Sequence, residues 1–392
     1  MSDSVVIVGM ARTAIGGMMG MYSDMSAPQL GASAIKAAIE EAGIPGSEVD
    51  EVIMGCVLPA GTGQAPARQA ALAAGIDKGV SCTTLNKVCG SGMSTVMVAH
   101  DAIKAGSAKV VIAGGMESMT NAPYLIPKAR SGYRFGHAEL LDHMLYDGLQ
   151  DAYEGGPMGA FGEICAEKYQ FSREQQDAFA IESLRRANEA IDQGKFKREI
   201  TDVVIKTRKG ETVCSNDEQP GNARADKIPQ LRPAFKKDGT ITAANASSIS
   251  DGAAALVLMS EAEASKRGLK VLATLKAHSH FAQEPEWFTT APVGAMTKLL
   301  EKLDWAADKV DLFEINEAFA VVTMAAMKEL DLPQDKVNVH GGACALGHPL
   351  GCSGARIIVT LLGAMETYKK KSGIASLCIG GGEATAVALE RS

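Results

Sequence analysis

One arrangement of turns, helices and strands occurs twice along the chain, and it restricts the possible folds more than any other feature of the sequence. In the first half, Cys89-Gly-Ser-Gly opens a predicted helix, and the next predicted strand ends in Gly114-Gly-Met-Glu117. In the second half, Cys352-Ser-Gly opens a helix, and the next strand ends in Gly380-Gly-Gly-Glu383. A chance match is one explanation, because βαβ units share glycine turns. A duplicated α/β domain accounts better for the same features in the same order.

Short apolar runs alternate with helical segments over most of the chain, which is the pattern of an α/β protein. We expect strands at residues 5–8, 52–54, 82–85, 109–113, 253–259, 271–277, 312–315, 374–379 and 384–389, and a short extended segment at residues 337–339. We expect helices at residues 28–42, 64–74, 91–105, 172–193, 261–266, 293–303, 317–330 and 354–370.

The alternation is lost between residue 121 and about residue 240, where Gly, Pro, Tyr and charged residues increase. One clear helix in this stretch begins at Ser172, which has the capping-box spacing with Gln175. The sequence therefore predicts an N-terminal α/β domain over residues 1–120, completed by residues 246–270. An inserted loop domain follows over residues 121–245, and a C-terminal α/β domain over residues 271–392.

The composition is that of an ordinary globular protein, with 46% hydrophobic and 22% charged residues among 392. The net charge of −7 argues against a nucleic-acid partner, and no apolar run is long enough to span a membrane. The N-terminus shows no targeting leader and the C-terminus no peroxisomal signal, so we expect a cytoplasmic protein. The eight cysteines lack a repeated short spacing, and we expect free thiols.

Cys89 lies in a glycine-containing turn between a predicted strand and a predicted helix. The start of a helix offers unpaired N–H groups and a positive dipole end, which favour a thiolate. We therefore expect a lowered pKa for Cys89 and a nucleophilic role, with nearby N–H groups available to an oxyanion. A buried structural thiol is the alternative interpretation.

The segment from Gly341 to Gly354 contains Cys344, His348 and Cys352 at a spacing that metal ligands could share on a helix. The glycines and the proline in this segment make a continuous helix improbable, so we expect no metal site. His348, between a glycine and a proline, is interpreted as an exposed and rigidly held imidazole that acts as a general base or hydrogen-bond donor. A histidine that caps a turn is the alternative.

Two further candidates follow predicted strands. Cys378 precedes the glycine run at the carboxyl end of its strand, where ligands bind in open α/β sheets, and a second thiol could act as an acid or base. Asn316 lies between a strand and a helix and either caps the helix or positions a substrate oxygen. A nucleophilic thiol, a base and oxyanion donors are what carbon–carbon condensation of thioesters requires.

These segments together resemble the thiolase family, and within it most closely the acetyl-CoA acetyltransferases. The resemblance covers essentially the whole chain. It rests on the order of Asn86-Lys-Val-Cys-Gly-Ser-Gly, Ala113-Gly-Gly-Met-Glu-Ser, Asn245-Ala-Ser, Asn316-Glu-Ala-Phe, Gly347-His-Pro and Leu377-Cys-Ile-Gly-Gly-Gly-Glu. It implies two duplicated α/β domains in a layered arrangement plus an inserted loop domain.

The resemblance implies roles for five residues. Cys89 would accept the acyl group, and His348 would activate it and help to hold the thioester oxygen. Asn316 would fix a water in that oxyanion site. Cys378 would take and return the proton during condensation, and the N–H groups of Cys89 and Gly380 would form a second oxyanion hole.

Further positions would contact the substrate. Ser247 matches the pantetheine-contacting serine of the family. Phe288 stands where the chain departs from the family pattern, and it leaves the acyl-chain preference open. The remaining lining positions, for which core packing is the alternative, are Leu149, Met158, Phe235, Ala243, Ala318 and Phe319. Candidates for the coenzyme A phosphates, or alternatively solvated surface charges, are Arg208, Lys209, Arg224 and Lys227.

The implied activity is the reversible Claisen condensation of two acetyl-CoA into acetoacetyl-CoA and CoA, through a ping-pong acyl-Cys89 intermediate. A degradative 3-ketoacyl-CoA thiolase of broader chain length is the alternative. Coenzyme A would be substrate and product, with no tightly bound cofactor. The family also implies a role in fatty acid metabolism and a homotetramer, whose tetramerisation loop would fall near residues 124–143.

Two other classes compete with this interpretation. Decarboxylating or carrier-dependent condensing enzymes share a similar duplicated fold, but Cys378 as a second thiol argues against them. A scaffold that binds coenzyme A or a sterol without catalysis is the other class, and the intact set of Cys89, His348 and Cys378 argues against it.

Overall fold

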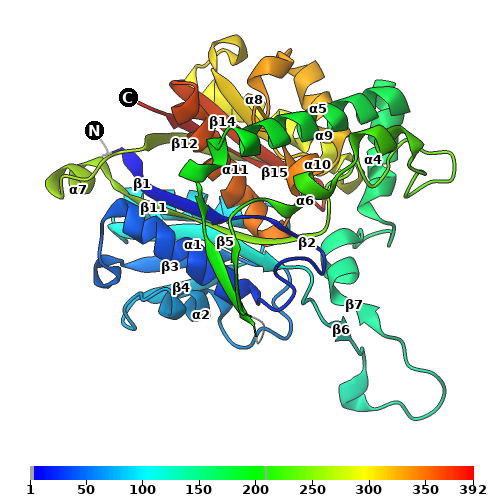
Figure 1. The fold of residues 1–392 in the computed structure, drawn as a ribbon, viewed down its shortest axis with the longest axis horizontal. Coiled ribbons are helices and arrows are strands. Elements are labelled where there is room, and N and C mark those ends of the chain that lie inside the picture. Colours follow the sequence, from blue (N-terminus) through cyan, green and yellow to red (C-terminus); the bar gives the residue numbers. More distant parts are fainter. Residues whose placement is uncertain (1–3, 208–209) are drawn as a thin grey trace.

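The computed structural model describes residues 4–207 and 210–392 and contains an eleven-stranded mixed sheet (Figure 1). The strands are β1 (Val5–Thr13), β2 (Gly16–Gly17), β3 (Glu51–Gly55), β4 (Ser81–Leu85), β5 (Val110–Ser118), β6 (Tyr124–Leu125), β7 (Leu141–Asp142), β8 (Ile200–Thr201), β9 (Val203–Thr207), β10 (Gly210–Cys214), β11 (Ser250–Ser260), β12 (Ala273–Ala282), β13 (Leu312–Ile315), β14 (Ser372–Ile379) and β15 (Glu383–Glu390). The helices are α1 (Ala27–Ala42), α2 (Pro66–Ala73), α3 (Ser91–Ala105), α4 (Met158–Tyr169), α5 (Arg173–Asp192), α6 (Glu218–Asn222), α7 (Glu261–Lys266), α8 (Ala291–Leu303), α9 (Ala320–Glu329), α10 (Ala343–Leu346) and α11 (Leu350–Thr367).

The order of strands in the sheet confirms the duplication. One half runs β3-β5-β11-β1, in which the first pair is parallel and the next two are antiparallel. The other half runs β13-β14-β15-β12 with the same sequence of parallel and antiparallel pairs. β1 pairs with β12 and joins the halves into one continuous sheet. The two halves also correspond at their outer edges. In the first half β4 pairs in parallel with β3, and in the second half Val337 forms a parallel bridge to Phe313 of β13.

Helices cover the halves in layers. α1 and α2 pack on the first half through one apolar core, and α8 packs on the second half through another (Figure 1). α3 and α11 contact each other, and their buried side chains form a third core with strands of both halves. The two helices therefore lie between the halves of the sheet, as the layered arrangement implied.

Equivalent glycines bring α3 and α11 together. A Cβ added to Gly92 of α3 would lie 2.7 Å from the backbone nitrogen of Ala355, and a Cβ on Gly354 of α11 would lie 2.3 Å from that of Met93. Both positions therefore admit only hydrogen. The backbones of the two helices approach closely where their first turns cross, which places the residues that precede the helices next to each other.

Several local predictions are corrected. The Gly-Gly pair of the first motif lies inside β5 instead of at its end. The close approach of α11 to the strand explains the glycine there, since a Cβ on Gly115 would lie 1.9 Å from the carbonyl oxygen of Gly351. The helix expected from residue 317 begins at Ala320, since Phe319 is extended and forms a bridge to Ala246. The helix expected from residue 354 already begins at Leu350. In the segment expected to be short and extended, Val337 is extended and forms one bridge, to Phe313.

The segment between β5 and β11 carries short strands and the helices α4, α5 and α6. Ser172 and Gln175 form the expected capping box at the start of α5. The loop that contains β6 and β7 projects away from the layered body in Figure 1. Among the described residues, no helix combines the length and apolarity that crossing a membrane requires. The domain boundaries drawn from the sequence remain a prediction.

We expect Gly354→Ala to lower the free energy of unfolding by roughly 1–3 kcal/mol, because the added methyl group would force apart two packed backbones. The loss would occur although alanine favours helices by about 1 kcal/mol over glycine. Gly221→Ala in α6 is the control, since no atom lies within 4 Å of its added Cβ. Denaturant unfolding of both variants measures the difference, and equal stability of the two would contradict the close-packing argument.

Candidate active site

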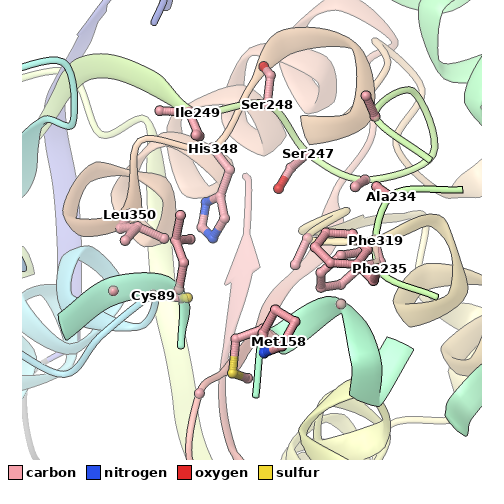
Figure 2. A pocket seen from close by; sticks show the side chains of 18 of the residues that line it. Cys89, Met158, Ala234, Phe235, Ser247, Ser248, Ile249, Phe319, His348 and Leu350 are labelled. Carbon is pink, nitrogen blue, oxygen red and sulfur yellow. The ribbon is translucent and has the colours of Figure 1, made fainter. Parts of the chain in front are cut away.

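A cavity of about 520 Å³ lies beside the starts of α3 and α11. His348 and Cys89 point into it, and Phe235 and Phe319 form the opposite side, with Met158 between them (Figure 2). Twelve of the thirteen residues predicted from the sequence line this cavity: Cys89, Leu149, Met158, Phe235, Ala243, Ser247, Phe288, Ala318, Phe319, His348, Cys378 and Gly380. The exception is Asn316.

The turn that carries Cys89 holds its backbone in a strained conformation. Val88 has a φ of 46°, in the left-handed region that β-branched residues avoid. The Asn86 side chain accepts a hydrogen bond from the Val88 N–H at 2.9 Å, and the Ser91 hydroxyl donates to the Val88 carbonyl at 2.6 Å. Ser91 also accepts from the Lys87 N–H at 2.8 Å. These side chains fix the turn that presents the Cys89 thiol to the cavity.

The electrostatic prediction for Cys89 is wrong for the protein without substrate. Burial raises the pKa of the Cys89 thiol to about 11, whereas the sequence predicted a lowered value. Hydrogen bonding from the backbone N–H groups of Gly380 and of Cys89 itself acts in the opposite direction, but burial outweighs it. At neutral pH the group is therefore a thiol, and the same two N–H groups are available to an oxygen on the acylated sulfur.

His348 lies in the turn between α10 and α11 and is buried, although the sequence predicted an exposed imidazole. The Ser353 hydroxyl donates to the Pro349 carbonyl at 2.9 Å and lies 2.5 Å from Nδ1 of His348. Ser353 therefore accepts from Nδ1–H, which leaves the lone pair on Nε2. Nε2 is buried and has no hydrogen-bond partner among the described residues.

Burial, followed by the positive charge of Arg356, lowers the pKa of His348 to about 3. The imidazole is therefore neutral at pH 7 and can receive a proton. The backbone explains its fixed position, because Gly347 has a φ of 106° and the His348 N–H donates to the Ser248 carbonyl at 3.1 Å.

Asn316 lies just behind the cavity, beyond the end of β13. It does not cap α9, which begins four residues later at Ala320. Its Nδ2 is buried without a partner among the described residues, while its Oδ1 lies 3.5 Å from Nη2 of Arg356. Nδ2 of Asn316 can donate a hydrogen bond and Nε2 of His348 can accept one, so a water or hydroxyl that accepts from the first and donates to the second would supply the missing partners.

Cys378 stands near the end of β14, next to β13, so Cys378 and Asn316 lie at strand ends as the sequence predicted. The Asn316 N–H donates to the Ser376 carbonyl at 3.0 Å across this strand pair. Burial, and then the proximity of Cys89, raises the pKa of Cys378 well above its usual value. Each thiol therefore disfavours ionisation of the other.

Aromatic side chains close the cavity around Cys378. Phe288 is buried, and its ring centroid lies 6.4 Å from that of Phe161 and 6.3 Å from that of Phe319. Phe235 meets Phe319 at 6.0 Å. All but Phe235 belong to one apolar cluster with Cys378. Aromatic rings therefore border the cavity on the side of this thiol.

A second cavity of about 330 Å³ shares Ala243, Ser248 and Gln219 with the first. Arg224 and Lys227 line it, as the prediction for phosphate-binding residues requires. The other two candidates, Arg208 and Lys209, lie outside the described residues. The two cavities together offer a path for an elongated ligand from a basic rim to the thiols.

Sequence reasoning missed the residues that support the site. Arg356 is fully buried in α11 and contacts Glu314 at 3.1 Å, and an arginine just before the apolar run Ile357-Ile-Val359 was the available signal. Glu117, noted only as part of the repeated motif, accepts backbone hydrogen bonds from Val57 at 2.9 Å and Gly351 at 2.7 Å. It thereby anchors the start of α11 to β5.

Comparison with known proteins identifies the family of this chain. Residues 5–262 match the family model of the thiolase N-terminal domain, and residues 269–391 match that of the thiolase C-terminal domain. The chain is 52% identical to acetyl-CoA acetyltransferase 2 of Arabidopsis thaliana, covering 98% of this chain and 96% of the relative. It is 48% identical to the acetyl-CoA acetyltransferase of Pseudomonas aeruginosa, over 99% and 100% of the two chains.

A solved structure is also similar. The Acat5 thiolase of Ascaris suum, crystallised in complex with coenzyme A, superimposes with a TM-score of 0.94 at 42% identity, covering 99% of this chain and 100% of that one. Both family models, the full-length relatives and the shared fold lead to one conclusion: the chain belongs to the thiolase family.

Proposed function

We propose that this protein is an acetyl-CoA C-acetyltransferase that interconverts two acetyl-CoA with acetoacetyl-CoA and CoA. The observation that carries the proposal is that Cys89, His348 and Cys378 line one cavity of suitable size. The activity printed in the names of the full-length relatives supports it. Coenzyme A is then substrate and product, and the coenzyme A complex of the Ascaris suum enzyme is consistent with that assignment.

In the first half-reaction, the Cys89 sulfur attacks the thioester carbonyl of acetyl-CoA while Nε2 of His348 takes the thiol proton. The sulfur–carbon bond to Cys89 forms and the bond to the CoA sulfur breaks. The departing CoA sulfur takes the proton of Cys378, so Cys378 becomes a thiolate while His348 keeps the proton from Cys89. Because Cys89 and His348 are both neutral in the buried site beforehand, proton transfer and attack must occur together.

In the second half-reaction, the Cys378 thiolate removes a proton from the methyl group of a second acetyl-CoA. The enolate oxygen accepts hydrogen bonds from the protonated Nε2 of His348 and from a water held by Nδ2 of Asn316. The enolate carbon attacks the acyl carbon on Cys89, and the new oxyanion accepts hydrogen bonds from the N–H groups of Cys89 and Gly380. Collapse of this intermediate expels the Cys89 sulfur, which takes back the proton held on Nε2 of His348, and acetoacetyl-CoA leaves.

The cavity favours a short acyl group. Phe288 and Phe319 fill the space beyond Cys378, so a long chain at that position would have to displace aromatic rings. The degradative alternative with a broader chain length requires such space. The pantetheine arm would pass Ser247, and the nucleotide phosphates would meet Arg224 and Lys227.

We further propose a cytoplasmic enzyme of fatty acid metabolism that assembles as a homotetramer through the loop at residues 124–143. This loop exposes Tyr124, Ile126, Tyr133 and Phe135, and Phe135 is essentially fully exposed. Apolar side chains gathered on one projecting loop are typical of a surface that is covered in an assembly.

Cys89→Ser and Cys378→Ser should separate the two half-reactions. We expect Cys89→Ser to abolish acyl-enzyme formation, because a serine hydroxyl is a far weaker nucleophile than a thiol. Cys378→Ser should still form acyl-Cys89, seen by mass spectrometry, while condensation falls by roughly 10²-fold or more. Near-normal turnover of Cys89→Ser, or equal loss of both half-reactions in Cys378→Ser, would overturn these roles.

The reactivity of Cys89 without substrate should follow its raised pKa of about 11. Below that pKa the group is a thiol, so we expect its alkylation by iodoacetamide to accelerate about tenfold for each pH unit from pH 8 to pH 10. Peptide mapping measures the rate, and Cys89→Ser reports the background from the other cysteines. A rate that is already constant between pH 6 and pH 8 would show a lowered pKa instead.

Steady-state thiolysis of 3-ketoacyl-CoA of increasing chain length tests the substrate assignment. We expect kcat/KM to be highest for acetoacetyl-CoA and to fall by roughly tenfold or more for long chains. Phe288→Ala should reduce this preference by opening space beside Cys378. A wild-type protein that cleaves long chains equally well would favour the degradative alternative.

A further inference from the structure

Three side chains that commonly bind metals converge far from the catalytic cavity. His100 and Asp101 lie on α3, and His278 lies on β12. Oδ1 of Asp101 is 2.9 Å from Nδ1 of His100 and 2.9 Å from Nε2 of His278. One ligand atom from each residue lies within 4.8 Å of the others. The two imidazole rings meet edge to face, with centroids 5.0 Å apart.

The surroundings hold the donors in place and keep one side open. The side chains of His100 and His278 are 12% and 14% exposed, whereas that of Asp101 is 65% exposed. Packing therefore fixes both imidazoles, while solvent reaches the carboxylate and could supply further ligands. Two imidazole nitrogens and one carboxylate oxygen are a donor set of Zn²⁺ and of neighbouring transition metals.

The protonation states at neutral pH suit a cation. Burial lowers the pKa of His100, so its ring is neutral, which is the form that binds a metal. Burial acts to raise the pKa of Asp101, but hydrogen bonds from His100 and His278 outweigh it and lower the pKa, so the carboxylate is ionised. Lys302 donates to the His278 carbonyl at 3.4 Å and, together with Lys104, adds positive charge nearby. We therefore expect weaker binding than in a closed four-ligand zinc site.

We propose that His100, Asp101 and His278 form a binding site for one divalent transition-metal ion, with Zn²⁺ as the representative ion. The ion would link α3 of the first half to β12 of the second half. The sequence analysis expected no metal because it weighed only the spacing around His348. Asp101 and His278 are 177 residues apart, so no spacing could reveal them.

The site would act on stability. His100 follows Cys89 by eleven residues, which is about 16 Å along a helix. A bound ion would fix the far end of the helix whose start carries the nucleophile turn, without contact to the cavity. We expect the metal to raise the midpoint of thermal unfolding and to leave kcat unchanged.

Metal titration of the chelator-treated full-length protein tests the proposal, with Zn²⁺ in calorimetry and Co²⁺ as a spectroscopic probe. We expect one equivalent per chain and a cobalt spectrum without a sulfur charge-transfer band. Asp101→Asn and His278→Gln should each weaken binding by roughly tenfold or more and remove the thermal shift. His280→Gln is the matched control, because His280 is exposed on the same strand two residues further on.

Three outcomes would overturn the site. The wild-type protein could fail to bind either cation, which would leave a hydrogen-bonded His–Asp–His cluster only. Binding could be equal in all variants, or the cobalt spectrum could show thiolate ligands from the cysteines. Acyl transfer without metal reports correct folding of each variant. If His278→Gln does not fold, Asp101→Asn alone decides whether the site binds metal, because the exposed Asp101 side chain can be changed without disturbing the core.

Discussion

The contact between the first turns of α3 and α11 is the constraint on which the active site depends. Gly92 and Gly354 let two backbones approach within distances that no side chain would permit. The nucleophile turn precedes one helix and the histidine turn precedes the other. Since both turns are fixed by the crossing of their helices, the thiol and the imidazole enter the same cavity without any direct bond between Cys89 and His348 to hold them there. Glu117 of β5 stabilises this contact by accepting a hydrogen bond from the Gly351 N–H in the first turn of α11.

Burial sets the chemistry of this cavity as much as residue identity does. It raises the pKa of both thiols and lowers that of His348, so the resting site carries no charge on its reacting groups. Charge must then develop during the reaction, next to hydrogen-bond donors that already stand in place. Arg356, which is paired with Glu314 and lies 3.5 Å from Oδ1 of Asn316, supplies a permanent positive charge that acts on His348.

Much of the fold could be predicted from the sequence, because the repeated motif and the apolar periodicity are local signals. The extent of α3 and the cap of α5 follow directly from such signals. The extended conformation of Phe319 could not be predicted, since it depends on a bridge to Ala246 across the fold.

The site likewise divides into features that local sequence signals predict and features that depend on contacts across the fold. Its members could be identified from motifs at turns, and most of them line the cavity. Their environment could not, because the exposure of His348 and the pKa of Cys89 depend on which distant segments pack over them. The role of Asn316 was open between a helix cap and a site amide, and only the position of α9 excluded the cap.

The duplicated architecture has a consequence for how a repeated unit can specialise. In the first copy, Cys89 stands three residues before Gly92 and lies in the turn before α3, whereas the place three residues before Gly354 lies inside α11. The cysteine of the second motif, Cys352, is buried within that helix in the core between the sheet halves. One copy therefore has a turn that presents its sulfur to the cavity, and in the other copy the longer helix packs its sulfur into the core. A difference of about one helical turn between the two copies is thus enough to give a duplicated fold one reaction centre instead of two.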